Sequence, residues 1–341
     1  MSDWKNSLEN SSPIKGWILD VYPSGPSQIT VWIIGENGER VKLVDHYVHR
    51  IYVSGSQSAL EELTRRIIDS ESVADFRFVE KYVDFMEASK KRVLEIDITD
   101  YGRTAFFARK ILRLGGYKKY QLYNVDVPVA QAYFYERDVF PLAHVLAHEP
   151  CHRVTYELLD SVESCNYEIP PMRHLWLDVV VGRKGAATSF SDKIETITLE
   201  CNGETLVING NNEADKILRM VEAIRQLDPD IIYTRGGDSF LFPYLAHRAF
   251  VNGILERFIL SRDPVPLKAM KGKGRSYFSY GRVYYKAPIR RLYGRIHIDV
   301  ENTFIYAASG LEGLIEVSRT CRVPLHRAAR ASIGSIMSSL Q

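Results

Sequence analysis

The sequence has few cysteines and no long apolar run, and both absences exclude classes of protein. No two cysteines form a Cys-x-x-Cys pair, so neither a zinc knuckle nor a disulfide framework is indicated, and we expect reduced thiols. The longest apolar stretches, such as residues 175–181, are far shorter than the run of about 20 residues that crosses a bilayer. We therefore expect a cytoplasmic protein with no membrane partner. The four cysteines are Cys151, Cys165, Cys201 and Cys321.

A strong net charge is also absent, because 44 basic residues against 42 acidic ones give +2. This balance argues against a uniformly basic surface for nucleic acid, although basic residues can still gather locally. A hydrophobic content of 45% and a charged content of 25% are those of an ordinary folded protein, so disorder across the chain is not expected. A length of 341 residues is enough for two domains.

The first third of the chain alternates apolar and polar residues, as β-strands do. After a polar segment of residues 1–13, we expect strands at residues 16–22, 28–34, 39–45 and 50–54. From Arg50 the expected order is strand, helix, strand, strand, helix and strand, which is the ferredoxin-like βαββαβ arrangement. The later elements of this order are expected at residues 57–70, 75–83, 92–98, 101–114 and 117–123.

Aromatic residues are frequent in one part of this segment. They could stack on bases, as sheet-surface aromatics do in RNA-recognition modules, but the more common role of such residues is to fill the core, and we expect that here. The residues are Phe76, Phe78, Tyr82 and Phe85.

A helix that starts at Pro128 is expected to close the first domain, and Pro170 and Pro171 are the expected hinge into a second domain. Between them, His144, His148 and His152 recur every four residues, which on a helix allows metal chelation from one face. Pro150 should end that helix before His152, and no acidic second shell is evident. We therefore expect a surface or domain-junction helix, with a metal site as the alternative.

The second half predicts three meandering strands, a helix, and a strand that returns beside the first. Residues 173–182 form an apolar strand with one carboxylate, Asp178. Strands at 194–201 and 205–209, a helix from 212 or 213 to 227, a strand at 231–234, a glycine turn and a helix to about 252 follow. Asp238 or Ser239 is the expected cap of this last helix. The order is the start of a ribonuclease-H-like fold, so the class is α/β (α+β): a β-rich first domain with a ferredoxin-like part, then a ribonuclease-H-like domain.

One stretch, from Asp228 to Leu245, carries a specific resemblance. It reads Asp-Pro-Asp-Ile-Ile-Tyr-Thr-Arg-Gly-Gly-Asp-Ser-Phe-Leu-Phe-Pro-Tyr-Leu. This resembles the second exonuclease motif of family B DNA polymerases, Asp-Pro-Asp-Ile-Ile followed after a few residues by Asn-Gly-Asp-x-Phe-Asp-x-Pro-Tyr-Leu. Residues 123–142 and 294–299 are also similar to that family. The resemblance implies the N-terminal domain (residues 1–171) and the 3'-5' exonuclease-like domain (residues 172–341) of a DNA-directed DNA polymerase of replication or repair, from a divergent archaeal branch with an inactivated exonuclease.

The carboxylates of an exonuclease are mostly missing. Two-metal cleavage needs about four carboxylates that converge on ions about 4 Å apart. The resemblance places Val180 at the glutamate of the first motif, Leu241 at the aspartate of the second and Gly236 at its asparagine; in the third motif Tyr306 is followed by Gly310. Asp178 is the only remnant, so we expect no catalytic residue and no metal.

Asp238 and Glu301 lie near these positions and are the two acidic residues that could substitute. Asp238 is expected to be a turn or helix cap instead, and Asp299 a strand-end residue that orients the following loop. The alternative to an inactive site is an active metal-dependent 3'-5' exonuclease with unconventional ligands.

Residues 264–298 contain nine basic residues, several tyrosines and no acidic residue. Cationic groups release counterions from phosphates and exposed aromatics stack on unpaired bases, so a two-stranded basic hairpin here predicts DNA binding. The alternative is a solvated hairpin whose aromatics pack on its own domain. The predicted DNA-binding residues are Lys268, Lys271, Lys273, Arg275, Tyr277, Tyr280, Arg282, Tyr284, Lys286 and Arg290.

The resemblance also implies partners. These are single-stranded template or primer-template DNA, and the palm, fingers and thumb of a polymerase, in the same polypeptide or in a separate subunit, because no palm motif occurs in this sequence. We expect no cofactor in this chain, Mg²⁺ for the full polymerase, and a nucleoid-associated location. A protein-interaction module that binds no DNA is the third alternative.

Overall fold

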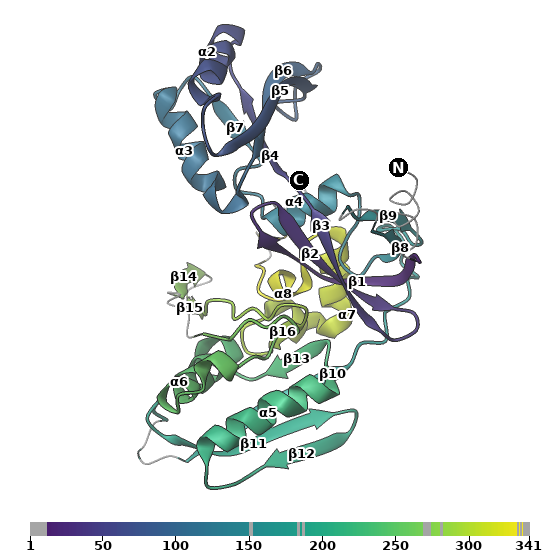
Figure 1. The fold of residues 1–341 in the computed structure, drawn as a ribbon, viewed down its shortest axis with the longest axis vertical. Helices are drawn as coiled ribbons and strands as arrows, with labels where there is room; N and C mark the ends of the chain where they lie inside the picture. Colours follow the sequence, from purple (N-terminus) through teal and green to yellow (C-terminus); the bar gives the residue numbers. More distant parts are fainter. Residues whose placement is uncertain are drawn as a thin grey trace, which may run out of the picture.

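The computed structural model describes residues 12–149, 153–182, 185, 188–268, 274–279, 282–332, 334 and 336. Three sheets follow one another along the long axis of the molecule (Figure 1). The ferredoxin-like sheet lies at one end, a five-stranded sheet lies in the middle, and a second five-stranded sheet with helix α5 lies at the other end. None of the helices in these ranges is long and apolar enough to span a membrane.

The middle sheet is antiparallel, in the order β3-β2-β1-β8-β9. The predicted meander of strands is confirmed, and the helix at Pro128 packs Tyr133 and Phe134 into the core of this sheet. Strand β1 pairs with β8, with Ile14 opposite Ala147, so the chain between β3 and β8 is an insertion into the sheet. The elements are β1 (Ile14–Gly25), β2 (Gln28–Gly35), β3 (Arg40–His46), α4 (Val129–Glu136), β8 (His144–His148) and β9 (Thr155–Leu158).

The inserted unit has the predicted ferredoxin-like order. Its antiparallel sheet runs β5-β6-β4-β7, and two helices cover one face of it. The Ser56 hydroxyl caps α2 by accepting from the N–H of Ala59. The elements are β4 (His49–Ser54), α2 (Gln57–Ile67), β5 (Val73–Lys81), β6 (Lys91–Ile98), η1 (Tyr101–Arg103), α3 (Thr104–Leu114) and β7 (Gln121–Tyr123).

The four aromatic residues of this unit divide into two pairs. Phe76 and Phe78 pack against the core beneath the helices, as expected. Tyr82 and Phe85 are 60% and 97% exposed, so the expectation that they face the core is wrong for these two. They lie just beyond the end of β5, where the strand no longer directs side chains toward the helices.

The histidine-rich segment is a strand, and the helix predicted for it is wrong. His144 and His148 begin and end β8. Four residues of extended chain span about 13 Å, too far for two side chains to chelate one ion. His144 instead stacks on Trp17, and its Nε2 lies 3.0 Å from Glu36 Oε1; His152 lies outside the described residues.

The second five-stranded sheet has the predicted ribonuclease-H-like topology, with the order β12-β11-β10-β13-β16. Strands β10, β11 and β12 are antiparallel, whereas β13 and β16 run parallel to β10. The predicted strand at residues 231–234 is confirmed to the residue. The elements are β10 (His174–Gly182), β11 (Lys193–Cys201), β12 (Glu204–Ile208), α5 (Glu213–Leu227), β13 (Ile231–Thr234), η2 (Gly237–Leu241), α6 (Phe242–Val251), η3 (Leu255–Arg257), β14 (Arg275–Ser279), β15 (Arg282–Lys286), β16 (Ile296–Asp299), α7 (Phe304–Thr320) and α8 (Leu325–Ala328).

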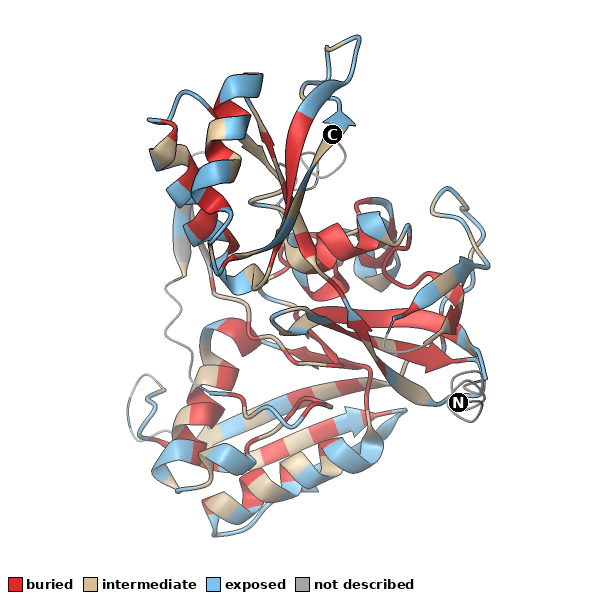
Figure 2. Cartoon of the chain, turned by 45° about the horizontal axis from the view of Figure 1, so that its top comes forward, coloured by how far each residue is buried: buried red, intermediate tan, exposed pale blue. Residues whose placement is uncertain are grey.

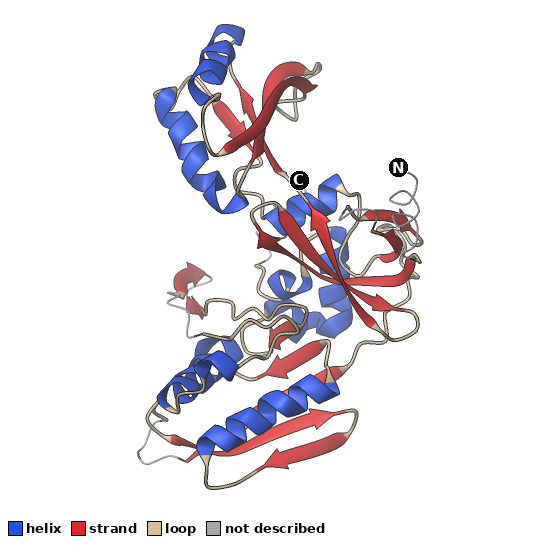
Figure 3. Cartoon of the chain, viewed as in Figure 1, coloured by secondary structure: helices blue, strands red, loops and turns tan. Residues whose placement is uncertain are grey.

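Helices α7 and α8 lie between the two five-stranded sheets (Figure 3). One buried cluster joins Leu19 of β1, Leu142, Ile298 of β16 and Leu314 of α7. Figure 2 shows this junction as a continuous buried region. The two sheets therefore share a core in addition to having their own.

Candidate functional site

The carboxyl ends of β13 and β16 meet at the glycine turn of the resembling motif. Gly236 has φ 65° and ψ 26°, the left-handed region that glycine adopts without strain. Gly237 is required for another reason: a Cβ there would lie 2.0 Å from Thr234 Oγ1 and 2.6 Å from His297 Nε2. The turn is thus fixed by conformation at one glycine and by packing at the next.

Asp299, at the end of β16, holds this turn. Its Oδ1 accepts from the backbone N–H of Gly236 at 2.9 Å and of Glu301 at 3.2 Å, and its Oδ2 accepts from the N–H of Asp238 at 2.8 Å. The expectation that Asp299 orients the following loop is confirmed, and the same carboxylate also fixes the glycine turn. Burial raises its pKa, although these N–H groups oppose the shift.

Asp238 is fully buried and is not a cap, so that prediction is wrong. Its carboxylate accepts from the backbone N–H of Arg290, from Asn302 Nδ2 and from Arg330 Nε, each at 2.8 Å. The side chain points into the interior because these three donors lie on the buried side of the turn. Burial alone would raise the pKa of Asp238, yet the charged Arg330 guanidinium holds it below its usual value.

His297, on β16, completes this buried cluster. Its Nε2 lies 2.8 Å from Thr234 Oγ1, and its Nδ1 lies 3.1 Å from the carbonyl oxygen of Arg290 and 3.0 Å from Arg330 Nη2. Burial and the nearby Arg330 charge lower the pKa of His297 to about 3. The ring is therefore neutral at pH 7 and serves as a hydrogen-bonding partner.

Val180 and Leu241, which stand where the resemblance places carboxylates, lie among apolar side chains. Leu241 is 5% exposed and packs in the core of the second sheet, while Val180 is 48% exposed. Val179, Val180 and Val181 line an open groove of about 600 Å³ with Phe240.

The remaining positions that match the family's metal-binding motifs supply one carboxylate, that of Asp178. Asp178 is exposed, and its Oδ1 accepts from the N–H of Val179 at 3.0 Å. Tyr306 packs on Tyr233, and Gly310 has φ 66° and interrupts α7. Within the described ranges, no three His, Cys, Asp or Glu side chains are grouped to hold a metal ion.

Comparison with known proteins shows what this region is similar to. Residues 186–305 match the model of the family B DNA polymerase exonuclease domain. The chain is related to family B DNA polymerases, over their N-terminal and exonuclease region. A solved family B DNA polymerase, from the hyperthermophilic archaeon Pyrobaculum calidifontis, superposes with a TM-score of 0.67 at 18% identity, over 96% of this chain and 50% of that one.

Sequence comparison also finds archaeal DNA polymerases. The DNA polymerase of Methanocaldococcus jannaschii is 26% identical over 236 residues, which is 64% of this chain and 13% of that protein. The DNA polymerase of Archaeoglobus fulgidus is 22% identical over 296 residues, which is 84% of this chain and 35% of that protein. The chain thus spans about a third or less of the length of these two relatives.

Asp228 and Asp230, which begin the stretch that resembles the exonuclease motif, have a role that the sequence did not predict. Asp230 is fully buried; it accepts from Arg40 Nε at 3.0 Å and Nη2 at 2.5 Å, and from Arg262 Nη2 at 2.8 Å. Asp228 accepts from Arg262 Nε at 2.8 Å and from Arg295 Nη2 at 2.9 Å. Since Arg40 lies on β3, its ion pair with Asp230 connects the second five-stranded sheet to the middle sheet.

A second tie lies on β1 and β2. Asp20 accepts from Arg291 Nη2 at 3.0 Å and from the N–H of Gly294 at 3.1 Å. Gly294 has φ 75°, and a Cβ there would lie 2.6 Å from Trp32 Nε1. Gly294 was the only sequence signal for either connection between the sheets. The bonded pairs Arg40–Asp230 and Asp20–Gly294 lie 190 and 274 residues apart in the sequence.

The basic hairpin is present as a two-stranded ribbon. Its strands β14 and β15 pair antiparallel, from Arg275 opposite Lys286 to Ser279 opposite Arg282. Lys268 is exposed and its Nζ lies 3.1 Å from Glu256. Arg290 is 7% exposed, with its backbone bound to Asp238, and this placement argues against direct DNA contact by its side chain.

The other predicted contacts of the hairpin cannot be placed. Lys271, Lys273 and Tyr280 lie outside the described residues. The structure describes only the backbone of the remaining five, which are Arg275, Tyr277, Arg282, Tyr284 and Lys286.

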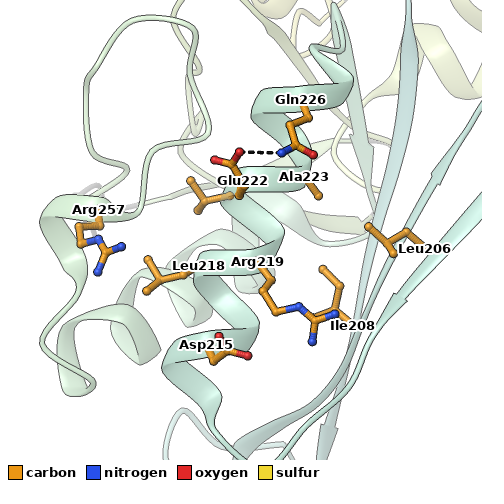
Figure 4. Close-up of a pocket in the computed structure, with 10 residues that line it drawn as sticks. Leu206, Ile208, Asp215, Leu218, Arg219, Glu222, Ala223, Gln226 and Arg257 are labelled. Atoms are coloured by element: carbon orange, nitrogen blue, oxygen red, sulfur yellow. Dashed lines mark hydrogen bonds between the residues drawn. The ribbon is translucent and has the colours of Figure 1, made fainter.

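The hollow of about 640 Å³ between α5 and β12 belongs to neither the glycine turn nor the hairpin (Figure 4). Acidic and basic residues alternate along it: Asp215 and Glu222 face it with Arg219 and Arg257. Gln226 donates to Glu222 at 2.7 Å. Its mixed charge points to no single ligand class.

Proposed function

We propose that this chain is a non-catalytic, DNA-binding part of a DNA polymerase, which holds single-stranded template or primer DNA. In this proposal residues 1–171 form an N-terminal domain and residues 172–341 an exonuclease-like domain, and the polymerase palm, fingers and thumb lie elsewhere. The observation that carries the loss of nuclease activity is the glycine turn. Its two aspartates, Asp238 and Asp299, are saturated by protein donors, and Leu241 is buried where the family motif has a ligand.

The ligand requirement of a two-metal site explains why these residues would not support cleavage. Two ions about 4 Å apart need several carboxylate oxygens that face a common open site. Here Asp238 accepts three hydrogen bonds and is 0% exposed, so it has no oxygen facing solvent. Family B polymerases and their exonuclease domains use divalent metals, but the described residues of this chain do not supply such a ligand set.

The acid-free segment of residues 264–298 supports the DNA-binding part of the proposal. The sequence of the ribbon itself, residues 275–286, has basic residues and no carboxylate, which favours phosphate binding. Outside the ribbon, Lys268, Arg291 and Arg295 pair with Glu256, Asp20 and Asp228. Exposed aromatics between the basic residues would stack on bases, whatever the sequence.

A salt titration of single-strand binding tests the hairpin. The variant Lys271→Gln, Lys273→Gln, Arg275→Gln and Arg282→Gln should bind a labelled oligonucleotide more weakly. The slope of log affinity against log salt should fall by about 0.7 for each lost phosphate contact. The matched control removes four exposed basic residues of the ferredoxin-like unit: Arg65, Arg109, Lys110 and Lys118.

Each outcome of this titration has a defined meaning. An unchanged slope in the hairpin variant would reject the role of the hairpin. An equal fall in the control variant would indicate only non-specific attraction. Absence of any binding at low salt would favour a protein-interaction module instead.

A nuclease assay tests the loss of catalysis. A 3'-labelled single strand incubated with the chain and Mg²⁺ or Mn²⁺ should stay intact. Metal-dependent degradation that Asp178→Ala abolishes would instead establish an active exonuclease with unconventional ligands.

A further inference from the structure

A small cavity of about 240 Å³ lies where α4, α7, α8 and the segment after β15 meet. Its walls are mostly apolar, and its polar lining comes from Gln131, Arg327 and Arg330. Ile289 also lines it, three residues after the end of the basic hairpin. In Figure 1 the hairpin lies at the same height as α8, to its left.

No acidic residue lines this cavity, so its charge is set by the two arginines. Arg330 is already committed, since it donates to Asp238, to the carbonyl oxygen of His297 and to that of His326. Arg327 differs: in the described part of the chain no hydrogen bond or ion pair of its guanidinium is found, while its side chain reaches solvent.

The surroundings of Arg327 favour an anion. Partial burial and the nearby Arg291 charge lower the pKa of Arg327. Among the described residues no carboxylate forms an ion pair with its guanidinium. Arg291 itself is paired with Asp20. A bound anion would supply the missing counter-charge.

The geometry narrows the class of anion. A guanidinium binds phosphate with two parallel N–H···O bonds, and no other common side chain does this as well. The volume is below the roughly 300 Å³ of sites for whole small ligands, so a phosphate with part of its sugar fits better than a complete nucleotide. The apolar walls suit the sugar carbons.

We propose that Arg327 and this cavity form a binding site for one backbone phosphate of a single DNA strand that leaves the basic hairpin. This site rests on the proposed function and extends it from the hairpin to the junction of the two sheets. It makes a contact with the backbone alone and therefore adds affinity without base preference.

The test measures binding of single-stranded dT16 and of a mixed-sequence 16-mer by the full chain, as a function of salt. Arg327→Gln should weaken both equally, by about tenfold, and reduce the salt slope by about 0.7. Arg327→Lys should keep the slope but lose part of the affinity, because an ammonium lacks the bidentate geometry. Ala331→Met fills the cavity without changing charge and should weaken binding as Arg327→Gln does.

The matched control is Arg219→Gln, an exposed arginine of α5 outside the cavity, which should bind as the wild type does. Unfolding midpoints should be alike, because in the described residues Arg327 is bonded through its backbone alone, and both substitutions leave that backbone unchanged. Wild-type affinity and slope in Arg327→Gln, together with weakened binding in the hairpin variant, would overturn the site but leave the proposed function intact. Absence of DNA binding by the wild type would overturn both.

Discussion

Aspartates lie beyond both ends of strand β13, and at its carboxyl end they are joined by Asp299 of the neighbouring strand β16. The two groups have different partners. At the amino end, Asp228 and Asp230 face arginines from four segments, including Arg40 of β3. At the carboxyl end, Asp238 and Asp299 accept mainly from backbone N–H groups close to the turn. The difference teaches that Asp228 and Asp230 join two sheets by charge, whereas Asp238 and Asp299 fix the glycine turn and bind one buried guanidinium, that of Arg330. Four experiments can break or sharpen this comparison.

The largest effect is expected at the carboxyl end. Asp238→Ala leaves the buried Arg330 guanidinium without its carboxylate and should lower the free energy of unfolding by about 3–5 kcal/mol. Urea-induced unfolding measures this. Asp178→Ala removes an exposed aspartate of the same sheet and should change stability by less than about 0.5 kcal/mol. Equal effects in the two variants would contradict the structural role of Asp238.

The next effect separates the two glycines of the turn. Gly237→Ala brings a methyl group against Thr234 and His297 and should cost about 2–3 kcal/mol. Gly236→Asn should cost less than about 1 kcal/mol, because asparagine tolerates the left-handed region and its Cβ would lie 3.3 Å from the flexible Glu301 carboxylate. Thermal unfolding of both variants gives the order, and a reversed order would show that the backbone conformation at Gly236 constrains the turn more than the packing at Gly237 does.

A double-mutant cycle measures the tie at the amino end. Asp230→Asn and Arg40→Gln, alone and combined, should give a coupling energy of about 2 kcal/mol, since both side chains are buried and bound by two hydrogen bonds. The exposed pair Lys15 and Glu36 is the control and should give a much smaller value. Similar coupling energies in both pairs would mean that the ion pair between Arg40 and Asp230 adds little to the stability of the protein.

The smallest effect is a pH dependence from the carboxyl end. The pKa of His297 is about 3 in the folded protein and near 6.5 in an unfolded chain, so the unfolded state binds the proton first. The stability that the neutral ring contributes is therefore present above pH 6.5 and lost as pH falls toward 3, by about 1–2 kcal/mol between pH 7 and 5.

The variant His297→Gln isolates that contribution. Its unfolding free energy should depend less on pH than that of the wild type over pH 5–7. Some dependence should remain, because burial also lowers the pKa of His326 well below its usual value. Identical pH profiles would show that His297 is not held neutral.

Much of the fold could be predicted because its signals are local. The strand at 231–234 is a short apolar run between Pro229 and the glycine turn, and both boundaries are set within a few residues. The ferredoxin-like order also followed from periodicity, since each of its helices has one apolar face.

The errors arose where distant partners decide the structure. Five residues from His144 to His148 fit a helix or a strand equally well, and pairing with β1 decides for the strand. Asp238 lies where a cap is expected, but Arg330, 92 residues later, directs its side chain inward. The loss of ligands at Val180 and Leu241 was visible from the resemblance, whereas the roles of Asp228 and Asp230 required the position of Arg40.

The insertion of the ferredoxin-like unit between β3 and β8 has a consequence for synthesis of the protein. The unit from His49 to Tyr123 is continuous in sequence, so it can fold on the ribosome as soon as it emerges. In the meander that precedes it, β1, β2 and β3 pair with one another, but β1 pairs with β8 only after the unit has been made, and Arg40 on β3 meets Asp230 later still. The inserted unit can therefore complete its own core before β1, which precedes it in the sequence, pairs with β8.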